Sequence, residues 1–223
     1  MKSYCFKKKN CAAPVTCDWN DSYWQGCNVA DIDIVYDRSS DHHPVVKGKF
    51  AHDDRHIYGI YQVQDRYIRA VAKKYQDSVC QDSCVEFFLK PSVGPGYFNL
   101  EMGAGGTYLF YYVIDNSHSE KGGFKNMIQV PWEDGCKIKL KTTLPKNIEP
   151  EITTPTTWCA QFSIPLSMLE KYTGKIGKLS GQTWTGNFYK CADKTSHPHW
   201  LSWSRVSTLN FHLPECFGQW LFE

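Results

Sequence analysis

The sequence predicts an all-β fold, a sandwich or barrel of short strands with one or two short helices. Short segments that alternate apolar and polar side chains recur along the chain, and turn residues separate them. Helical periodicity, in contrast, is scarce. The 223 residues suit one large β-domain. Because no repeat, low-complexity linker or domain boundary is visible, we expect a single domain over residues 1–223.

Two adjacent segments show the alternation most clearly. Residues 84–91 alternate apolar side chains with Glu86, and residues 97–103 alternate them with Asn99 and Glu101. Successive side chains of a strand point to opposite faces of the sheet. The two segments therefore predict half-buried strands whose carboxylates and amide project away from the apolar face.

Further strands follow from the same pattern along the rest of the chain. They are expected at residues 31–36, 45–52, 57–65, 107–114, 136–142, 157–165, 182–192 and 218–222. Gly105 and Gly106 indicate a tight hairpin turn between two of the strands. The polar, glycine- or proline-containing residues 116–126 and 145–155 are expected to form loops.

Two short helices are expected between the strands. Residues 67–75 place four apolar side chains on one helical face. Residues 168–172 follow Ser167, which predicts an N-cap, with Glu170 at the third helical position as in a capping box.

Charge and composition exclude several classes of function. Lys and Arg number 25 and Asp and Glu 23, so the net charge is +2, and neither a basic stripe nor a nucleic-acid reader motif is present. No segment approaches the ~20 apolar residues of a membrane span. The lysines at residues 7–9 predict a solvated N-terminal turn, and no apolar stretch of signal-peptide length follows them. We therefore expect no nucleic-acid or membrane partner, and a cytoplasmic location is favoured.

Ten cysteines are many for a chain with no visible export signal. Their even number would suit disulfides in an oxidising compartment, but no spacing requires them. A structural zinc site is disfavoured because no Cys-x-x-Cys pair occurs. We expect most of the cysteines to be buried free thiols that pack as small apolar residues.

An ordered set of motifs resembles the family 9 carbohydrate-binding modules. The most specific is Asp-Ser-Cys-Val-Glu-Phe-Phe-Leu at the start of the first acidic strand. Others lie at residues 19–24, 30–34, 56–65, 186–193, 201–204 and 211–218. The resemblance implies a jelly-roll-type β-sandwich and non-catalytic recognition of a mono- or oligosaccharide, at a glycan end, in carbohydrate catabolism. A module of this kind normally serves a glycoside hydrolase, so such a partner is implied without being identified.

The resemblance also assigns ligand contacts. Glu86 matches a carboxylate that binds sugar hydroxyls, where it accepts two hydrogen bonds from a vicinal diol. Asn99 and His197 match polar or basic sugar contacts, and Glu101 shares the polar face of Asn99. A salt bridge from Glu86 to Lys90, or to an arginine on the same face, is the structural alternative.

Two aromatic rings enclose the terminal sugar in this family. Phe211 matches one ring, but Cys80 stands at the other position. Because a thiol cannot cover a sugar face, either Tyr75 or Tyr67 replaces the second ring or the clamp is lost. The family also implies structural calcium, for which Asp53, Asp54 and Asp65 are weak candidates, although no loop has a recognisable ligand spacing.

Other functions remain open from the residues alone. Glu86 and Glu101 could form the acid–base pair of a glycoside-processing enzyme. A β-sandwich of this kind could also bind haem or another apolar ligand, with His197 or His212 as axial ligand. His197 and His199, two residues apart, could bind a metal with His212 or Cys191 as the third ligand.

Overall fold

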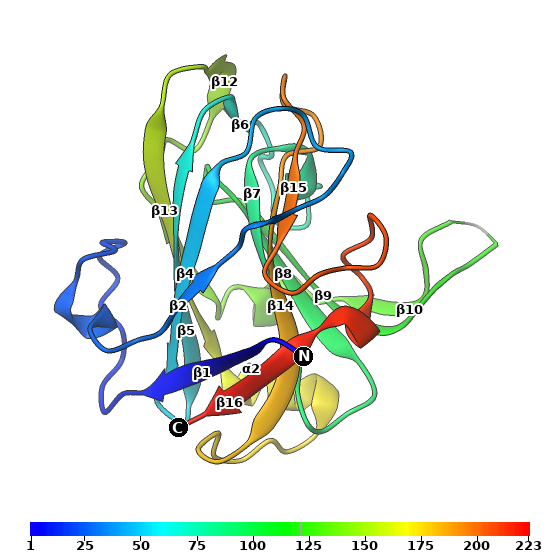
Figure 1. Cartoon of the computed structure of the whole chain (residues 1–223). Coiled ribbons are helices and arrows are strands. Elements are labelled where there is room, and N and C mark those ends of the chain that lie inside the picture. Colours follow the sequence, from blue (N-terminus) through cyan, green and yellow to red (C-terminus); the bar gives the residue numbers. More distant parts are fainter. Residues whose placement is uncertain (121) are drawn as a thin grey trace.

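The computed structural model describes residues 1–120 and 122–223, which form two facing layers of a curled β-sheet (Figure 1). In the first layer the strand order is β10 (Phe124–Gln129), β9 (Tyr108–His118), β8 (Tyr97–Gly103), β7 (Cys84–Lys90), β14 (Thr183–Cys191) and β16 (Gly218–Phe222). In the second it is β4 (Val45–His52), β5 (His56–Asp65), β13 (Thr156–Pro165) and β11 (Lys139–Thr142).

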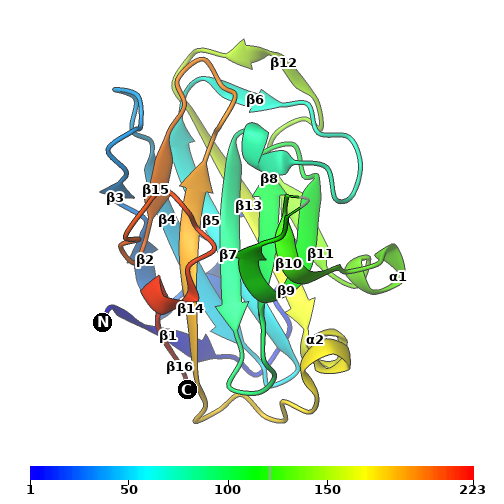
Figure 2. The same cartoon turned by 90° about the vertical axis from the view of Figure 1, so that its right-hand side faces the viewer.

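Strand β1 (Ser3–Lys8) joins the two layers near the chain termini. Its residues 3–6 pair with β16 and its residues 7 and 8 pair with β4, in both cases in parallel. The shorter strands β2 (Val29–Asp31), β3 (Ile34–Val35) and β15 (Trp200–Ser202) extend the layers, and β6 (Ile68–Ala70) pairs with β12 (Ile148–Ile152) across one end of the sandwich (Figure 2).

Helical structure is limited to short pieces. These are α1 (Trp132–Gly135), α2 (Leu166–Thr173) and the 3₁₀ turns η1 (Ser22–Trp24), η2 (Val79–Gln81) and η3 (Pro214–Cys216). Among the described residues, no helix has both the length and the apolar character needed to cross a membrane. Because strands form both layers and the helices are few and short, the predicted all-β sandwich is confirmed.

Aromatic side chains fill the space between the layers. The rings of Phe50 and Phe188 stack with centroids 4.1 Å apart, and the ring centroids of Phe87 and Phe162 lie 4.8 Å apart. Alternation along β7 places Phe87 in this core and turns Glu86 to the outer face. Each large side chain buried in this way contributes about 1.5–3 kcal/mol to stability.

The close approach of β14 to its neighbours requires a glycine. A Cβ atom on Gly186 would lie 2.3 Å from the Trp220 ring and 2.4 Å from the backbone oxygen of Phe88. Because the backbone oxygen cannot move aside without disturbing β7, Gly186 allows Trp220 to pack directly over the strand.

Most predicted strands lie within a few residues of their observed positions, but the helix expected at residues 67–75 is wrong. Residues 68–70 form β6 instead, because they pair with β12. The carboxylate of Asp82 then accepts hydrogen bonds from the backbone N–H groups of Val71 and Ala72, both at 2.8 Å. These contacts hold the segment extended where a helix would need to begin.

Other local expectations also need correction. Helix α2 begins at Leu166, directly after Pro165, and Ser167 is not its N-cap. Glu170 accepts hydrogen bonds from the N–H groups of Ile176 and Gly177 and so closes the following loop. Residues 136–138 form a turn, so that only the end of the strand expected over 136–142 forms as β11.

Strand structure also replaces the turn expected at the lysines of residues 7–9 and parts of the two expected loops. Lys7 and Lys8 belong to β1, so the prediction of a solvated turn there is wrong. The loop expected at 116–126 contains the end of β9 and the start of β10, with Lys121 outside the described residues, and the loop expected at 145–155 contains β12.

Candidate functional site

A cavity of about 180 Å³ opens on the outer face of β7, β8 and β14, the face turned toward the viewer in Figure 2. It is lined by Cys80, Glu86, Glu101, Cys191, Asp193, Trp200, Leu209, Asn210, Phe211 and His212. The strands form its floor. The segments that follow β14 and β15 form its walls together with Cys80 of η2, and none of the described residues that line it is a Lys or Arg.

The floor carries two carboxyl groups side by side. Glu86 of β7 and Glu101 of β8 face each other directly in the antiparallel ladder, and they are only 2% and 6% exposed. The side-chain amide of Asn99 donates to Glu101 Oε1 at 3.0 Å, and the Cys191 thiol donates to Glu86 Oε1 at 2.9 Å. Within the described chain, Glu86 Oε2 has no hydrogen-bond partner.

Burial determines the ionisation of this pair. It raises the pKa of Glu86 well above its usual range, and the neighbouring Glu101 charge raises it further. Burial also raises the pKa of Glu101 to about 7. Because two adjacent carboxylates without a cation repel each other, the pair holds at most one full charge near neutral pH. Glu86 forms none of the ion pairs found in the described chain, so the salt bridge to Lys90 is absent there.

Aromatic rings form part of the wall. Phe211 stacks on Tyr189 with centroids 4.0 Å apart and an interplanar angle of 8°, and the Tyr189 hydroxyl donates to the Phe211 backbone oxygen at 3.0 Å. Trp200 lines the same cavity, and its indole N–H donates to Asp193 Oδ1 at 2.8 Å. The cavity thus combines fixed ring surfaces with buried carboxyl groups.

His212 completes the wall as a neutral ring. Its Nδ1 lies 2.8 Å from the Tyr97 hydroxyl, and it packs against Phe88 and Phe124. Burial lowers its pKa to about 4. The ring is therefore uncharged near neutral pH and adds no positive charge to the cavity.

The structure brings together most of the predicted ligand residues. Glu86, Glu101 and Phe211 line one cavity, and Asn99 contacts Glu101 beside it. Tyr75 lies elsewhere: its hydroxyl donates to the Val130 backbone oxygen at 2.7 Å, and its ring packs against Tyr108 and Trp132.

His197 also lies outside the lining of this cavity. Its ring stacks on Tyr67 with centroids 3.6 Å apart, at the edge of a different cluster. Neither Tyr67 nor Tyr75 therefore takes the ring position that Cys80 leaves open.

Sequence reasoning missed Trp200 and Asp193 as lining residues. A signal for Trp200 was present, because Leu201 and Trp203 are buried and strand alternation turns Trp200 to the opposite side. Asp193 lies in a turn after β14, where no periodicity predicts the direction of a side chain.

A second polar cluster lies on the inner side of β14. Lys190 and Asp65 are almost fully buried, with Nζ 3.5 Å from Oδ2, and His42 Nε2 lies 2.7 Å from Asp65 Oδ1. Lys190 Nζ donates to His199 Nε2 at 2.7 Å, and His199 Nδ1 lies 2.8 Å from the His197 backbone oxygen. Both ring nitrogens of His199 are thus engaged, so the predicted His197–His199 metal pair does not fit this arrangement.

The three aspartates considered for calcium do not converge. Asp53 and Asp54 lie in the turn before β5, and Asp65 lies at the far end of that strand. Asp53 accepts from the Tyr58 hydroxyl at 2.8 Å, and Asp54 pairs with Lys8 at 2.6 Å. Each carboxylate is already bonded within the protein, so the residues do not fit the calcium site that the resemblance implied.

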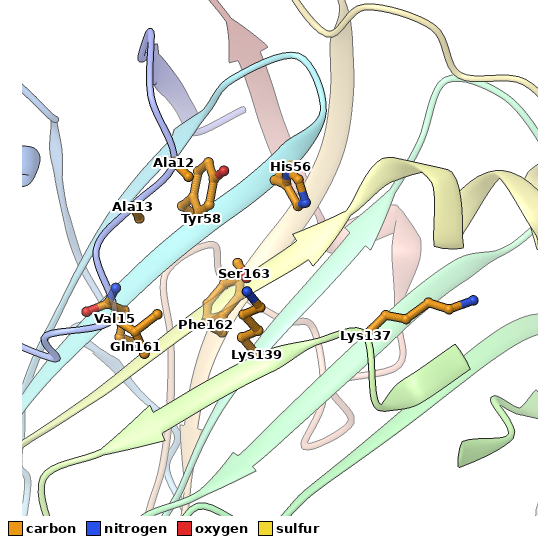
Figure 3. A pocket seen from close by; sticks show the side chains of 10 residues that line it. All are labelled: Ala12, Ala13, Val15, His56, Tyr58, Lys137, Lys139, Gln161, Phe162 and Ser163. Carbon is orange, nitrogen blue, oxygen red and sulfur yellow. The ribbon is translucent and has the colours of Figure 1, made fainter. Parts of the chain in front are cut away.

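Another cavity, of about 140 Å³, lies between the N-terminal segment and strands β5 and β13 (Figure 3). Its lining residues are Ala12, Ala13, Val15, His56, Tyr58, Lys137, Lys139, Gln161, Phe162 and Ser163. Gln161 is used structurally, because its side-chain oxygen accepts from the Cys17 N–H at 2.7 Å and its amide donates to Pro14. With no carboxylate among its lining residues, this cavity is the weaker candidate for binding hydroxyl groups.

Comparison with known proteins defines the class of the chain. Residues 23–222 match the model of carbohydrate-binding family 9. The chain belongs to this family, and the predicted role in carbohydrate binding is thereby confirmed. Among curated proteins, none matches the chain significantly.

Solved structures share the fold over the whole chain. A Bacteroides uniformis protein, provisionally described as carbohydrate-binding, is 30% identical with a TM-score of 0.83, and the match covers 100% of this chain and 99% of that one. A family 9 carbohydrate-binding module from Caldicellulosiruptor kristjanssonii is 16% identical with a TM-score of 0.62. It was solved with glucose and with cellotriose, and these matches cover 100% of this chain and 96% and 94% of the other.

Proposed function

We propose that the cavity above Glu86 and Glu101 binds the terminal ring of a neutral saccharide and does not cleave it. The observation that supports this most is the unpartnered, buried Oε2 of Glu86 at the floor of a cavity walled by Phe211 and Trp200. A buried acceptor without a partner costs free energy, and a ligand hydroxyl that donates to it removes that cost.

The chemistry of the lining suits a sugar ring. Carboxyl groups hydrogen-bond ligand hydroxyls in either protonation state, and aromatic rings cover the apolar C–H faces of a pyranose. The fold relative from Caldicellulosiruptor kristjanssonii was solved with glucose and with cellotriose, which makes glucose and short β-glucans the first ligands to test. Trp200 would supply the ring surface that Cys80 cannot.

The geometry favours binding over hydrolysis. In a glycosidase the two carboxyl groups flank the scissile bond. Glu86 and Glu101 instead project from the same floor and face each other across neighbouring strands. One oxygen of Glu101 accepts from Asn99, and one of Glu86 accepts from Cys191. We therefore expect no chromophore release from a panel of aryl glycosides; steady release that Glu86→Gln abolishes would contradict this.

The binding proposal is tested with a glycan panel. Saccharides are first screened by thermal shift, since a ligand that binds only the native state raises the melting temperature. Hits are then measured by isothermal titration calorimetry. Glu86→Ala should weaken binding roughly ten- to a hundredfold, corresponding to about 1.5–3 kcal/mol. The exposed Glu133→Ala is the matched control and should leave the affinity unchanged.

The aromatic wall is tested in the same assay. Phe211→Ala and Trp200→Ala should each weaken binding, whereas Trp132→Ala, which removes a tryptophan 57% exposed at the start of α1, should not. If a saccharide binds with unchanged affinity to the Glu86, Phe211 and Trp200 variants, the site lies elsewhere. Lys139→Ala would then test the cavity of Figure 3.

A further inference from the structure

Two thiols and a carboxylate meet at the floor of the cavity. Cys84 of β7 and Cys191 of β14 face each other directly in the antiparallel ladder, and Glu86 follows on the same face of β7. One ligand atom from each of the three residues lies within 4.8 Å of the other two. All three side chains are almost fully buried.

A second observation points to a ligand at this cluster. Glu86 is 2% exposed, and its Oε2 has no hydrogen-bond partner in the described parts of the chain. Its other carboxyl oxygen touches the Cys191 thiol at 2.9 Å. Both Glu86 and Cys191 line the cavity, so a solute that enters it reaches the group directly.

We propose that Cys84, Glu86 and Cys191 form a binding site for a thiophilic divalent cation of the zinc class. Zinc takes thiolate and carboxylate ligands in a tetrahedral arrangement, with a fourth position often left to water or a ligand. The open side of the cavity supplies that position. Calcium and magnesium are disfavoured because they prefer oxygen ligands throughout.

Binding needs only small movements and a defined exchange of protons. With bond lengths of about 2.3 Å to sulfur and about 2.0–2.2 Å to oxygen, a tetrahedral ion holds its ligands roughly 3.5–4 Å apart. The three ligand atoms, which lie within 4.8 Å of one another, reach this spacing through shifts of about 1 Å. The two thiol protons and the proton that Glu86 holds near neutral pH leave to solvent, and the cation then balances two of the three negative charges. This site goes beyond saccharide binding and does not require it.

The test uses the full, reduced chain after removal of metal by dialysis against a chelator. Co²⁺ is titrated in while absorbance is followed, because thiolate–cobalt bonds give a charge-transfer band in the near ultraviolet and tetrahedral sites give strong visible bands. We expect saturation at one Co²⁺ per chain and loss of the bands when one equivalent of Zn²⁺ is added.

Variants identify the ligands. Cys84→Ser and Cys191→Ser should each weaken Co²⁺ binding at least a hundredfold, and Glu86→Gln at least tenfold. Cys159→Ser, which changes a buried thiol on β13 in the other layer, is the matched control and should leave the titration unchanged. If a serine variant fails to fold, Cys84→Ala or Cys191→Ala replaces it, because alanine keeps the apolar packing. The same weakening of Co²⁺ binding is then expected.

Two results would overturn the proposal. One is the absence of thiolate–cobalt absorption at an equivalent of Co²⁺. The other is an unchanged band in the Cys84 and Cys191 variants, which would assign it to other cysteines. Saccharide affinity measured in excess chelator separates the two proposals. No metal is bound under these conditions, so a weaker saccharide affinity of the Glu86→Ala variant there reports on saccharide binding alone.

Discussion

The buried ion pair between Asp65 and Lys190 makes a strong prediction about stability. Lys190 Nζ lies 3.5 Å from Asp65 Oδ2, and neither side chain is accessible to water. At that distance and an effective dielectric constant of ~20, the Coulomb attraction is about 5 kcal/mol. Asp65→Asn leaves the ammonium buried with only neutral acceptors, His199 and the Cys191 backbone oxygen. We expect a loss of about 3–5 kcal/mol in the free energy of unfolding.

Urea denaturation followed by tryptophan fluorescence measures this loss. The control is Asp33→Asn, which removes an exposed partner 3.8 Å from Lys2 and should cost less than about 1 kcal/mol. The double variant Asp65→Asn/Lys190→Met should be less destabilised than the sum of the single variants, because it leaves no unpaired charge. A loss below about 1 kcal/mol for Asp65→Asn, or strict additivity, would refute the reasoning.

The same pair predicts a dependence on pH. Burial acts to raise the pKa of Asp65, but the Lys190 charge and the hydrogen bond from His42 outweigh it and lower the pKa to about 2. The pKa of an aspartate in the unfolded chain is about 3.9. Asp65 therefore contributes about 2–3 kcal/mol to the free energy of unfolding above pH ~4, and this contribution is lost as pH falls toward 2. The difference in stability between the wild type and Asp65→Asn should therefore narrow by that amount between pH 5 and pH 2.

Three further outcomes are expected. Gly186→Ala should lower the free energy of unfolding by about 1–3 kcal/mol in urea titrations, because the added methyl group meets Trp220 and a backbone oxygen; an unchanged midpoint would contradict this. Glu86→Gln should raise the stability at pH 8 by at least about 1 kcal/mol, because burial and the neighbouring carboxylate raise the pKa of Glu86, whereas Glu133→Gln should have no effect. A thiol reagent added after denaturation without reductant should find most of the ten cysteines reactive; a count near zero would indicate disulfides and an oxidising compartment.

The alternation of side chains predicted much of the fold and the centre of the site. A period of two located β7 and β8 and turned Glu86, Asn99 and Glu101 away from the core, because the direction of a strand side chain depends only on its position in the pleat. The direct opposition of Glu86 and Glu101 needed the register of the ladder, which the sequence of one strand does not contain.

Two of the strands that were not predicted, β1 and β6, have partners that are distant in sequence. β1 pairs in parallel with β16 at the other end of the chain, and its lysines at residues 7 and 8 hide the pattern. β6 exists because β12 pairs with it, and the apolar residues after it fit a helix equally well until Asp82 binds their backbone. The position of His197, which stacks on Tyr67, could not be derived either, because it lies in a loop where no periodicity gives the direction of a side chain.

Strand β14 explains why no positive charge lies among the described residues that line the cavity. Successive residues Tyr189, Lys190 and Cys191 point alternately outward, inward and outward. Lys190, the one basic residue of β14, therefore lies on the other side of the sheet from the carboxyl pair and is bound to Asp65. A lysine on the outer face would neutralise Glu86 and occupy its free oxygen. Its placement inside leaves that oxygen unpartnered. The floor of the cavity is therefore suited to ligands that bring hydrogen-bond donors or positive charge, and it disfavours anionic sugars such as uronic acids.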